Sequence, residues 1–166
     1  MIVTYLYILA LIITSLLIQG HSSFDVLRIV GIKPDLTFII VIYLAYNFGP
    51  FYGVVTGFIC GILHDAVSNS PLGLLTLPKV ALGLIVGMFG RSILRKNILS
   101  ISMMILFSTI AKGLITLLLC YLFTTGSLST VWHIILPESL YNAILAPFLF
   151  YLFDKIFRED LSKEEY

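Results

Sequence analysis

Charged residues are scarce in this 166-residue sequence: Asp, Glu, Lys and Arg make up 11% of it, and 59% of the residues are apolar. Soluble globular domains average about 25% charged and about 45–50% apolar residues. The composition therefore argues strongly against a soluble enzyme or a soluble nucleic-acid-binding domain. With a mean hydropathy of +1.05, we expect an integral membrane protein with no nucleic-acid partner. The net charge of +1 by itself argues neither for nor against a polyanionic partner.

Cysteine is rarer still, with only Cys60 and Cys120, both inside apolar runs. Their separation fits neither a redox pair nor a metal-binding motif, and we interpret both as small apolar side chains. The sequence also lacks a nucleophile elbow, a phosphate-binding loop and a paired acid and base. His64 stands beside Asp65, but adjacent helical residues point to different faces. We therefore expect no metal site, no cofactor and no catalytic residue.

The long apolar runs indicate membrane-spanning helices. Residues 1–20 contain no charge and lack the basic start and cleavage site of a secretory signal, so they predict a first span. The run at 36–63 would be about 42 Å long as one helix, against a hydrocarbon core of about 30 Å. Because Gly49-Pro50 is a turn signal within this run, we expect a second and a third helix joined by a tight hairpin.

Three further spans are predicted at 71–90, 98–123 and 134–153, the first of them opening with Pro71. The connections are a polar segment at 21–33, a basic loop at 91–97 and an uncharged loop at 124–133, in which Trp132 is expected to anchor at the membrane interface. The sequence thus predicts an all-α polytopic membrane protein. Residues 1–153 form one transmembrane bundle, and residues 154–166 form a short charged cytoplasmic tail.

The distribution of basic residues predicts the orientation, because cytoplasmic loops are enriched in Lys and Arg. With six spans, Arg28 and Lys33 lie on one side of the membrane, and the other side holds Arg91, Arg95, Lys96, Lys155, Arg158 and Lys163. Both termini are then cytoplasmic. Five spans would bring Arg28 and Lys33 to the basic side as well. Charge counting alone therefore favours five spans, whereas the helix lengths and the Gly-Pro break favour six.

Glycine recurs at every fourth position through the predicted third helix. This stripe ends in Asp65 and consists of Gly49, Gly53, Gly57 and Gly61, with a shorter instance, Gly83 and Gly87, on the fourth helix. Small residues at this spacing allow two helix backbones to approach closely. We interpret the stripe as packing within the bundle, with docking of a partner helix as the alternative.

Four ionisable residues lie within the predicted spans or at their ends: Asp65, Lys79, Lys112 and Glu138. Such groups cost about 2.5–3.5 kcal/mol each at the bilayer centre on insertion scales and are functional candidates. All four fall in the outer half of the membrane or near its midplane, and their charges cancel. We predict a buried polar cluster in which Asp65 and Glu138 offset Lys79 and Lys112. In the alternative, each lysine extends independently to the membrane surface or to a water defect.

Several short motifs occur in a recognisable order. Pro34-Asp35-Leu36 is followed by Gly57-Phe58, Gly61 and Asp65, then by the polar turn 68–70 and by Pro71-Leu72-Gly73, and the last helix contains Pro137, Asn142 and Pro147. In this combination, nearly the whole chain resembles the bacterial rod shape-determining family MreD. His64, Lys79 and Lys112 are not part of the family pattern.

The resemblance implies a non-enzymatic subunit of the cell-elongation machinery in the bacterial inner membrane, surrounded by lipid. Such a subunit binds the single-span protein MreC directly, and MreB filaments and peptidoglycan synthases through the complex. The resemblance also makes Pro71, Gly73, Pro137 and Asn142 candidates for helix packing or partner binding. It further implies a fold similar to the substrate-binding subunits of energy-coupling-factor vitamin transporters. A small-molecule-binding subunit of that kind, with a polar and aromatic cavity, is the alternative function.

Overall fold

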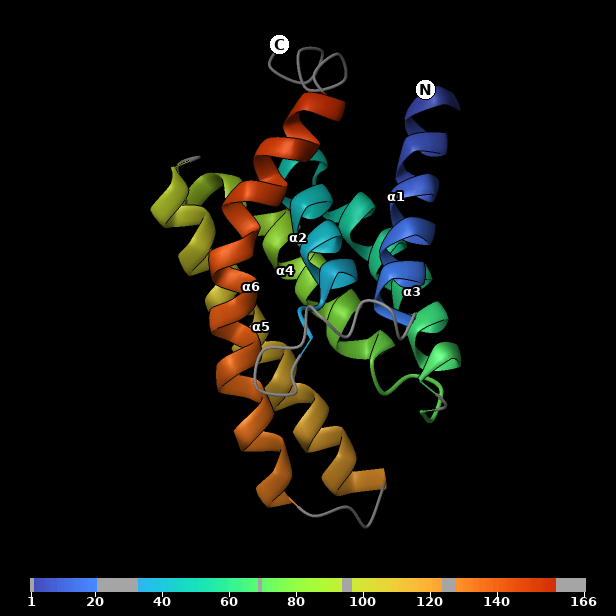
Figure 1. Ribbon diagram of the computed structural model, residues 1–166, viewed down its shortest axis with the longest axis vertical. Helices are drawn as coiled ribbons and strands as arrows, with labels where there is room; N and C mark the ends of the chain where they lie inside the picture. Colours follow the sequence, from blue (N-terminus) through green and yellow to red (C-terminus); the bar gives the residue numbers. More distant parts are fainter. Residues whose placement is uncertain (1, 21–32, 69, 94–96, 124–127, 158–166) are drawn as a thin grey trace.

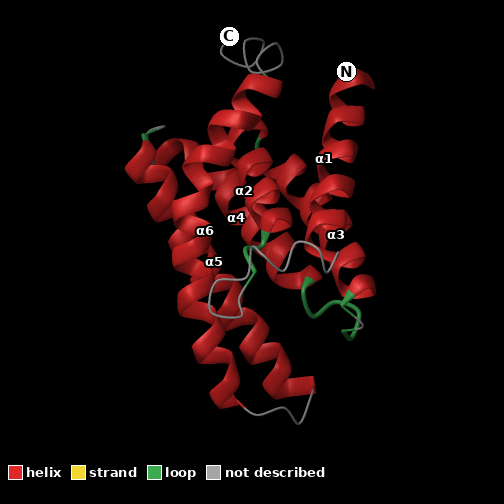
Figure 2. Ribbon diagram, in the orientation of Figure 1, coloured by secondary structure: helices red, strands yellow, loops and turns green. Residues whose placement is uncertain are grey.

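The computed structural model describes residues 2–20, 33–68, 70–93, 97–123 and 128–157, and within these ranges the chain is helical with no β-strand (Figure 2). The helices are α1 (Ile2–Gly20), α2 (Leu36–Phe48), α3 (Pro50–Val67), α4 (Thr76–Ile93), α5 (Ile98–Phe123) and α6 (Leu128–Ile156). The predicted all-α architecture is confirmed. Successive helices run in alternating directions, so α1 begins and α6 ends at the same end of the bundle (Figure 1).

Among the described residues, three helical segments are long and apolar enough to cross a membrane: Pro50–Val67, Ile98–Phe123 and Ile134–Ile156. Three shorter apolar segments accompany them: Ile8–Gln19, Leu36–Phe48 and Thr76–Gly90. These lengths and compositions fit an integral membrane protein. The count of six spans stays a prediction, because the 13 residues of α2 cover only about 20 Å of a hydrocarbon core of about 30 Å.

The predicted break between the second and third helices is confirmed at Gly49-Pro50. Gly49 ends α2 with a φ of +91°, a backbone conformation that glycine adopts without steric cost. Pro50 then opens α3, where its missing N–H leaves no hydrogen bond unmade. The two helices therefore form a tight antiparallel hairpin.

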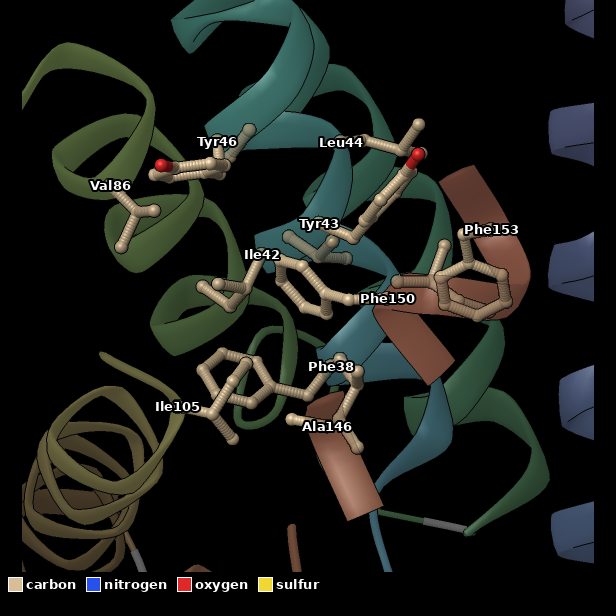
Figure 3. Close-up of a cluster of buried hydrophobic side chains, with 14 of the residues drawn as sticks. Phe38, Ile42, Tyr43, Leu44, Tyr46, Val86, Ile105, Ala146, Phe150 and Phe153 are labelled. Carbon is tan, nitrogen blue, oxygen red and sulfur yellow. The ribbon is translucent and has the colours of Figure 1, made fainter. Parts of the chain in front are cut away.

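Helix α2 is the centre of the fold. It is apolar on all sides, and every residue from Thr37 to Asn47 is buried, as expected of a helix enclosed by others. Tyr43 lies among the phenylalanines of α6, with ring centroids 5.0 Å from Phe150 and 5.1 Å from Phe153 (Figure 3). Helices α1, α3, α4 and α6 all pack against α2. Its polar residues are therefore shielded from lipid by the surrounding helices.

Two predicted helix boundaries are corrected. The fourth helix begins at Thr76 rather than at Pro71, because Gly73 adopts a φ of +102° and residues 71–75 form a turn. Its other end is Ile93, so Arg91 belongs to α4 and not to the predicted basic loop, whose residues 94–96 lie outside the described residues.

The sixth helix is longer than predicted in both directions. It starts at Leu128, because residues 128–133 contain neither Gly nor Pro, and Trp132 is thus helical rather than part of a loop. It ends at Ile156, and Asp154 of the predicted tail accepts a hydrogen bond of 3.0 Å from Tyr43 Oη. Residues 158–166 of that tail lie outside the described residues, as do residues 21–32 and 124–127 of the predicted connections.

Candidate functional site: a buried polar network at the start of α2

Asp35 is the centre of a buried polar network. It caps the N-terminus of α2: its Oδ1 accepts hydrogen bonds from the Phe38 backbone N–H at 2.9 Å and from the Thr37 hydroxyl at 2.7 Å. Aspartate is favoured at this position because the first N–H groups of a helix have no partner within the helix. The same carboxylate also receives two lysines, at 3.4 Å from Lys79 Nζ and 2.8 Å from Lys112 Nζ.

Lys79 of α4 is 1% exposed. Besides Asp35, its ammonium group contacts Thr37 Oγ1 at 2.6 Å and His64 Nδ1 at 2.7 Å. An ammonium group has three N–H donors. Lys79 has three acceptors to match them: Thr37 on α2, Asp35 at the N-cap of α2 and His64 on α3. This arrangement gives hydrogen-bond partners to a lysine that is almost fully buried.

Lys112 of α5 connects Asp35 to α6. Its Nζ forms a close ion pair with Glu138 Oε1 and lies 5.1 Å from the centre of the Phe38 ring. Asn142, also on α6, accepts a hydrogen bond of 3.0 Å from the Asp35 backbone N–H and approaches Thr109 of α5 at 3.4 Å. Five helices, α2 to α6, therefore meet in this polar network.

The two lysines lie at the same depth in the bundle. Lys79 is 14 residues from the end of α4 at Ile93, and Lys112 is 14 residues from the start of α5 at Ile98, which places each about 21 Å from that end. The formal charges of the network cancel, with Asp35 and Glu138 facing the two lysines. Buried charges are tolerated in this way when each is paired and hydrogen-bonded.

Asp65 is not part of this network, and the expectation that it offsets a lysine is corrected. It is fully buried, and its carboxylate accepts hydrogen bonds from the backbone N–H groups of Gly73 and Leu75, both at 2.9 Å, and from the Thr76 hydroxyl at 2.6 Å. Asp65 thus holds the turn that joins α3 to α4, including Pro71 and Gly73. The carboxylate that pairs with the two lysines is that of Asp35.

The glycine stripe lies between α3 and α4. A Cβ atom at Gly57 would lie 2.9 Å from the backbone oxygen of Lys79, and one at Gly61 would lie 2.8 Å from the Thr76 Cβ. Gly53 faces Gly83 in the same way, and Gly87 faces Pro50. Glycine is required here because the two backbones touch. The face that the stripe presents is therefore occupied by α4, and only Gly49 has open space around it.

The comparisons with known proteins identify the family. A model of the family described as rod shape-determining protein MreD matches residues 1–159 of the chain. The chain belongs to the MreD family. Searches of the curated proteins and of the solved structures each returned no match. The resemblance inferred from the sequence motifs is thus confirmed.

Membership of the MreD family assigns the chain a role in rod-shape determination, as part of the shape-determining complex. MreD is a shape-determining family and not a known enzyme family. Within the described residues, no three His, Cys, Asp or Glu side chains are placed to hold a metal ion. A cavity of about 400 Å³ lies between the α3–α4 turn and the end of α5, and residues such as Leu72, Leu77 and Phe123 line it.

Sequence reasoning missed three members of the network: Asp35, Thr37 and His64. Pro34-Asp35-Leu36 is typical of a helix N-terminus. The motif does not indicate that this N-terminus lies deep in the bundle. The available signal was the position of Asp35 directly before a short apolar run, since a charged residue inside the membrane is costly and is a functional candidate. Pro137 and Pro147, by contrast, are in α6 as predicted, and neither ends the helix.

Proposed function

We propose that this MreD-family chain is a non-enzymatic membrane scaffold that binds MreC directly and, through the complex, MreB filaments and peptidoglycan synthases. The match of the MreD family over residues 1–159 carries this proposal. The network supports it, because Asp35, Lys79 and Lys112 are occupied with one another. Polar groups committed in this way stabilise a shape and are not free to act on a substrate.

We infer further that the chain crosses the membrane six times with both termini in the cytoplasm. The alternating helix directions support an even number of crossings (Figure 1). The positive-inside rule supports the same orientation, because α4 ends on the side where α6 ends, Arg91 is near that end of α4, and Arg95 and Lys96 come next in the sequence. The polar network then lies in the outer half of the membrane, and residues 1–153 form the bundle to which the tail is attached.

The glycine stripe contributes to this scaffold from within. Because Gly53, Gly57 and Gly61 contact α4, they set the crossing of two helices and do not offer a groove to a partner. The turn held by Asp65, with Pro71 and Gly73, and the α6 residues Pro137 and Asn142 have the same shaping role in this proposal. A partner helix would then bind the outward apolar faces of the bundle.

The alternative of a small-molecule-binding transporter subunit has less support. Such a subunit needs a cavity with polar groups that orient the ligand. The cavity beside the α3–α4 turn is lined by Pro71, Leu72, Gly73, Leu74, Leu77, Leu119 and Phe123. No charged residue is among them, and Asp35, Lys79, Lys112 and Glu138 pair with each other. We therefore favour the scaffold.

Co-isolation tests the scaffold directly. The tagged chain, extracted from rod-shaped cells in a mild detergent, is expected to recover MreC in a roughly one-to-one ratio, because the two bind without an intermediary. MreC whose spanning helix is replaced by an unrelated one serves as the control and separates contacts in the membrane from contacts outside it. A folded, monodisperse preparation that recovers no MreC would refute direct binding.

A further inference from the structure

Lys79 and His64 are not both fully protonated while their side chains are hydrogen-bonded to each other. Lys79 Nζ and His64 Nδ1 are 2.7 Å apart, which is a hydrogen-bond distance. At that distance one nitrogen donates and the other must offer a lone pair. An ammonium group and an imidazolium group have no lone pair to offer. The contact therefore exists only while the two side chains together carry no more than one positive charge.

His64 is the member of this pair that is able to take up another proton. Lys79 is 1% exposed and already donates to Thr37 and Asp35. His64 is half-buried and lies in the last turn of α3, next to the turn that connects to α4. A free imidazole takes up a proton near pH 6.5, within the range that cells and their surroundings experience.

The charges around His64 act in both directions: the carboxylates of Asp35 and Asp65 favour a proton there, and the ammonium groups of Lys79 and Lys112 oppose it. The Asp65 carboxylate next to His64 accepts three hydrogen bonds from the α3–α4 turn. The titratable groups near the pair are Asp35 on α2, Cys60 and Asp65 on α3, Lys79 on α4, Lys112 on α5 and Glu138 on α6.

We propose that His64 is a proton-binding site that controls how firmly the end of α3 is attached to α4. A proton added at Nδ1 removes the lone pair that Lys79 uses, and two positive groups then face each other. Lys79 keeps Thr37 and Asp35 as acceptors, whereas the His64 ring turns away from it. The last turn of α3 and the α3–α4 turn beside it are then held less firmly. Acidification therefore loosens this end of the bundle.

Thermal unfolding in lipid nanodiscs between pH 8 and pH 5 tests this proposal. For a chain of this size, losing one charged hydrogen bond is expected to lower Tm by about 2–4 °C. Between pH 8 and pH 5, the decrease in Tm should be larger for the wild type than for His64→Gln by this amount. The glutamine amide oxygen still accepts a hydrogen bond from Lys79 and does not titrate. His133→Gln is the matched control and should behave as the wild type does. Equal falls for wild type and His64→Gln would overturn the proposal.

A second measurement uses the wild-type chain alone and keeps the test decisive if His64→Gln does not fold. Nitrogen-15 NMR of labelled histidine should show an unprotonated Nδ1 in His64 at pH 8 and protonation of both ring nitrogens by pH 5. Amide hydrogen exchange over residues 64–76, corrected for its intrinsic pH dependence, should rise over the same range. A ring that stays neutral, or exchange that does not change, would overturn the proposal. Neither measurement involves MreC, so their outcome is independent of the scaffold function.

Discussion

Asp35→Asn is expected to destabilise the chain by about 3–5 kcal/mol, the range measured when one member of a buried ion pair is removed. The asparagine oxygen still accepts from Phe38 and Thr37, so the change removes the charge and preserves the helix cap. Lys79 and Lys112, 1% and 8% exposed, then lose the carboxylate that they share. Unfolding of the purified chain in nanodiscs, and its level in the membrane, measure the loss.

Glu138→Gln is the matched comparison for Asp35→Asn, because it also removes one negative charge from the network. The Glu138 side chain is 16% exposed and faces one lysine, and that lysine keeps Asp35. We therefore expect Glu138→Gln to destabilise the chain less than Asp35→Asn does. Equal losses, or a larger loss for Glu138→Gln, would contradict the central position of Asp35.

Gly53→Ala is expected to separate α3 from α4. The new Cβ would lie 2.7 Å from the Cβ of Ala45 and 2.7 Å from the backbone carbonyl carbon of Gly83, and neither of these atoms is at the end of a flexible side chain. Overpacking of this kind costs about 1–3 kcal/mol. The measurement is again the unfolding midpoint, combined with the yield of monodisperse protein.

Gly90→Ala provides the control for the glycine prediction, since it adds the same methyl group to α4. There the nearest atom is the Cδ2 of Tyr46 at 3.0 Å, which belongs to a side chain and not to a backbone, so a shift of a few tenths of an ångström relieves the contact. Alanine also gains up to about 1 kcal/mol over glycine within a helix. Gly90→Ala should therefore be close to neutral, and a loss as large as that of Gly53→Ala would contradict the backbone-contact explanation.

The helices of this chain could be predicted from sequence wherever apolar runs end at clear signals. The length of the run at 36–63, together with Gly49-Pro50, predicted the α2–α3 hairpin, and 98–123 matches α5 residue for residue. The start of α4 could not be predicted, because Pro71 is typical of a first helical turn. Gly73, however, adopts a positive φ in a turn that Asp65 holds from eight residues away.

The depth of each residue along its helix predicts one part of the polar network and not another. The predicted contact between Lys112 and Glu138 fits the depths that the structure gives, since Lys112 is 11 residues from the end of α5 and Glu138 is 10 residues from the start of α6. The partner of Lys79 could not be predicted from depth. Asp65 lies at a comparable depth, but its carboxylate accepts hydrogen bonds from backbone N–H groups of the turn. Asp35 reaches the lysines because α2 is short and begins at their depth, a fact that only the packing of the other helices determines.

The scaffold requires α3 to cross the membrane from the cytoplasmic to the outer surface, and cysteine labelling measures this directly. After replacement of Cys60 and Cys120 by alanine, single cysteines are placed at Phe51, 71% exposed near the start of α3, and at Leu72, 79% exposed in the α3–α4 turn. An impermeant maleimide applied from outside should label Leu72→Cys in intact cells, and Phe51→Cys only after the membrane is opened. Labelling of both from the same side, or in the reverse order, would contradict the proposed arrangement.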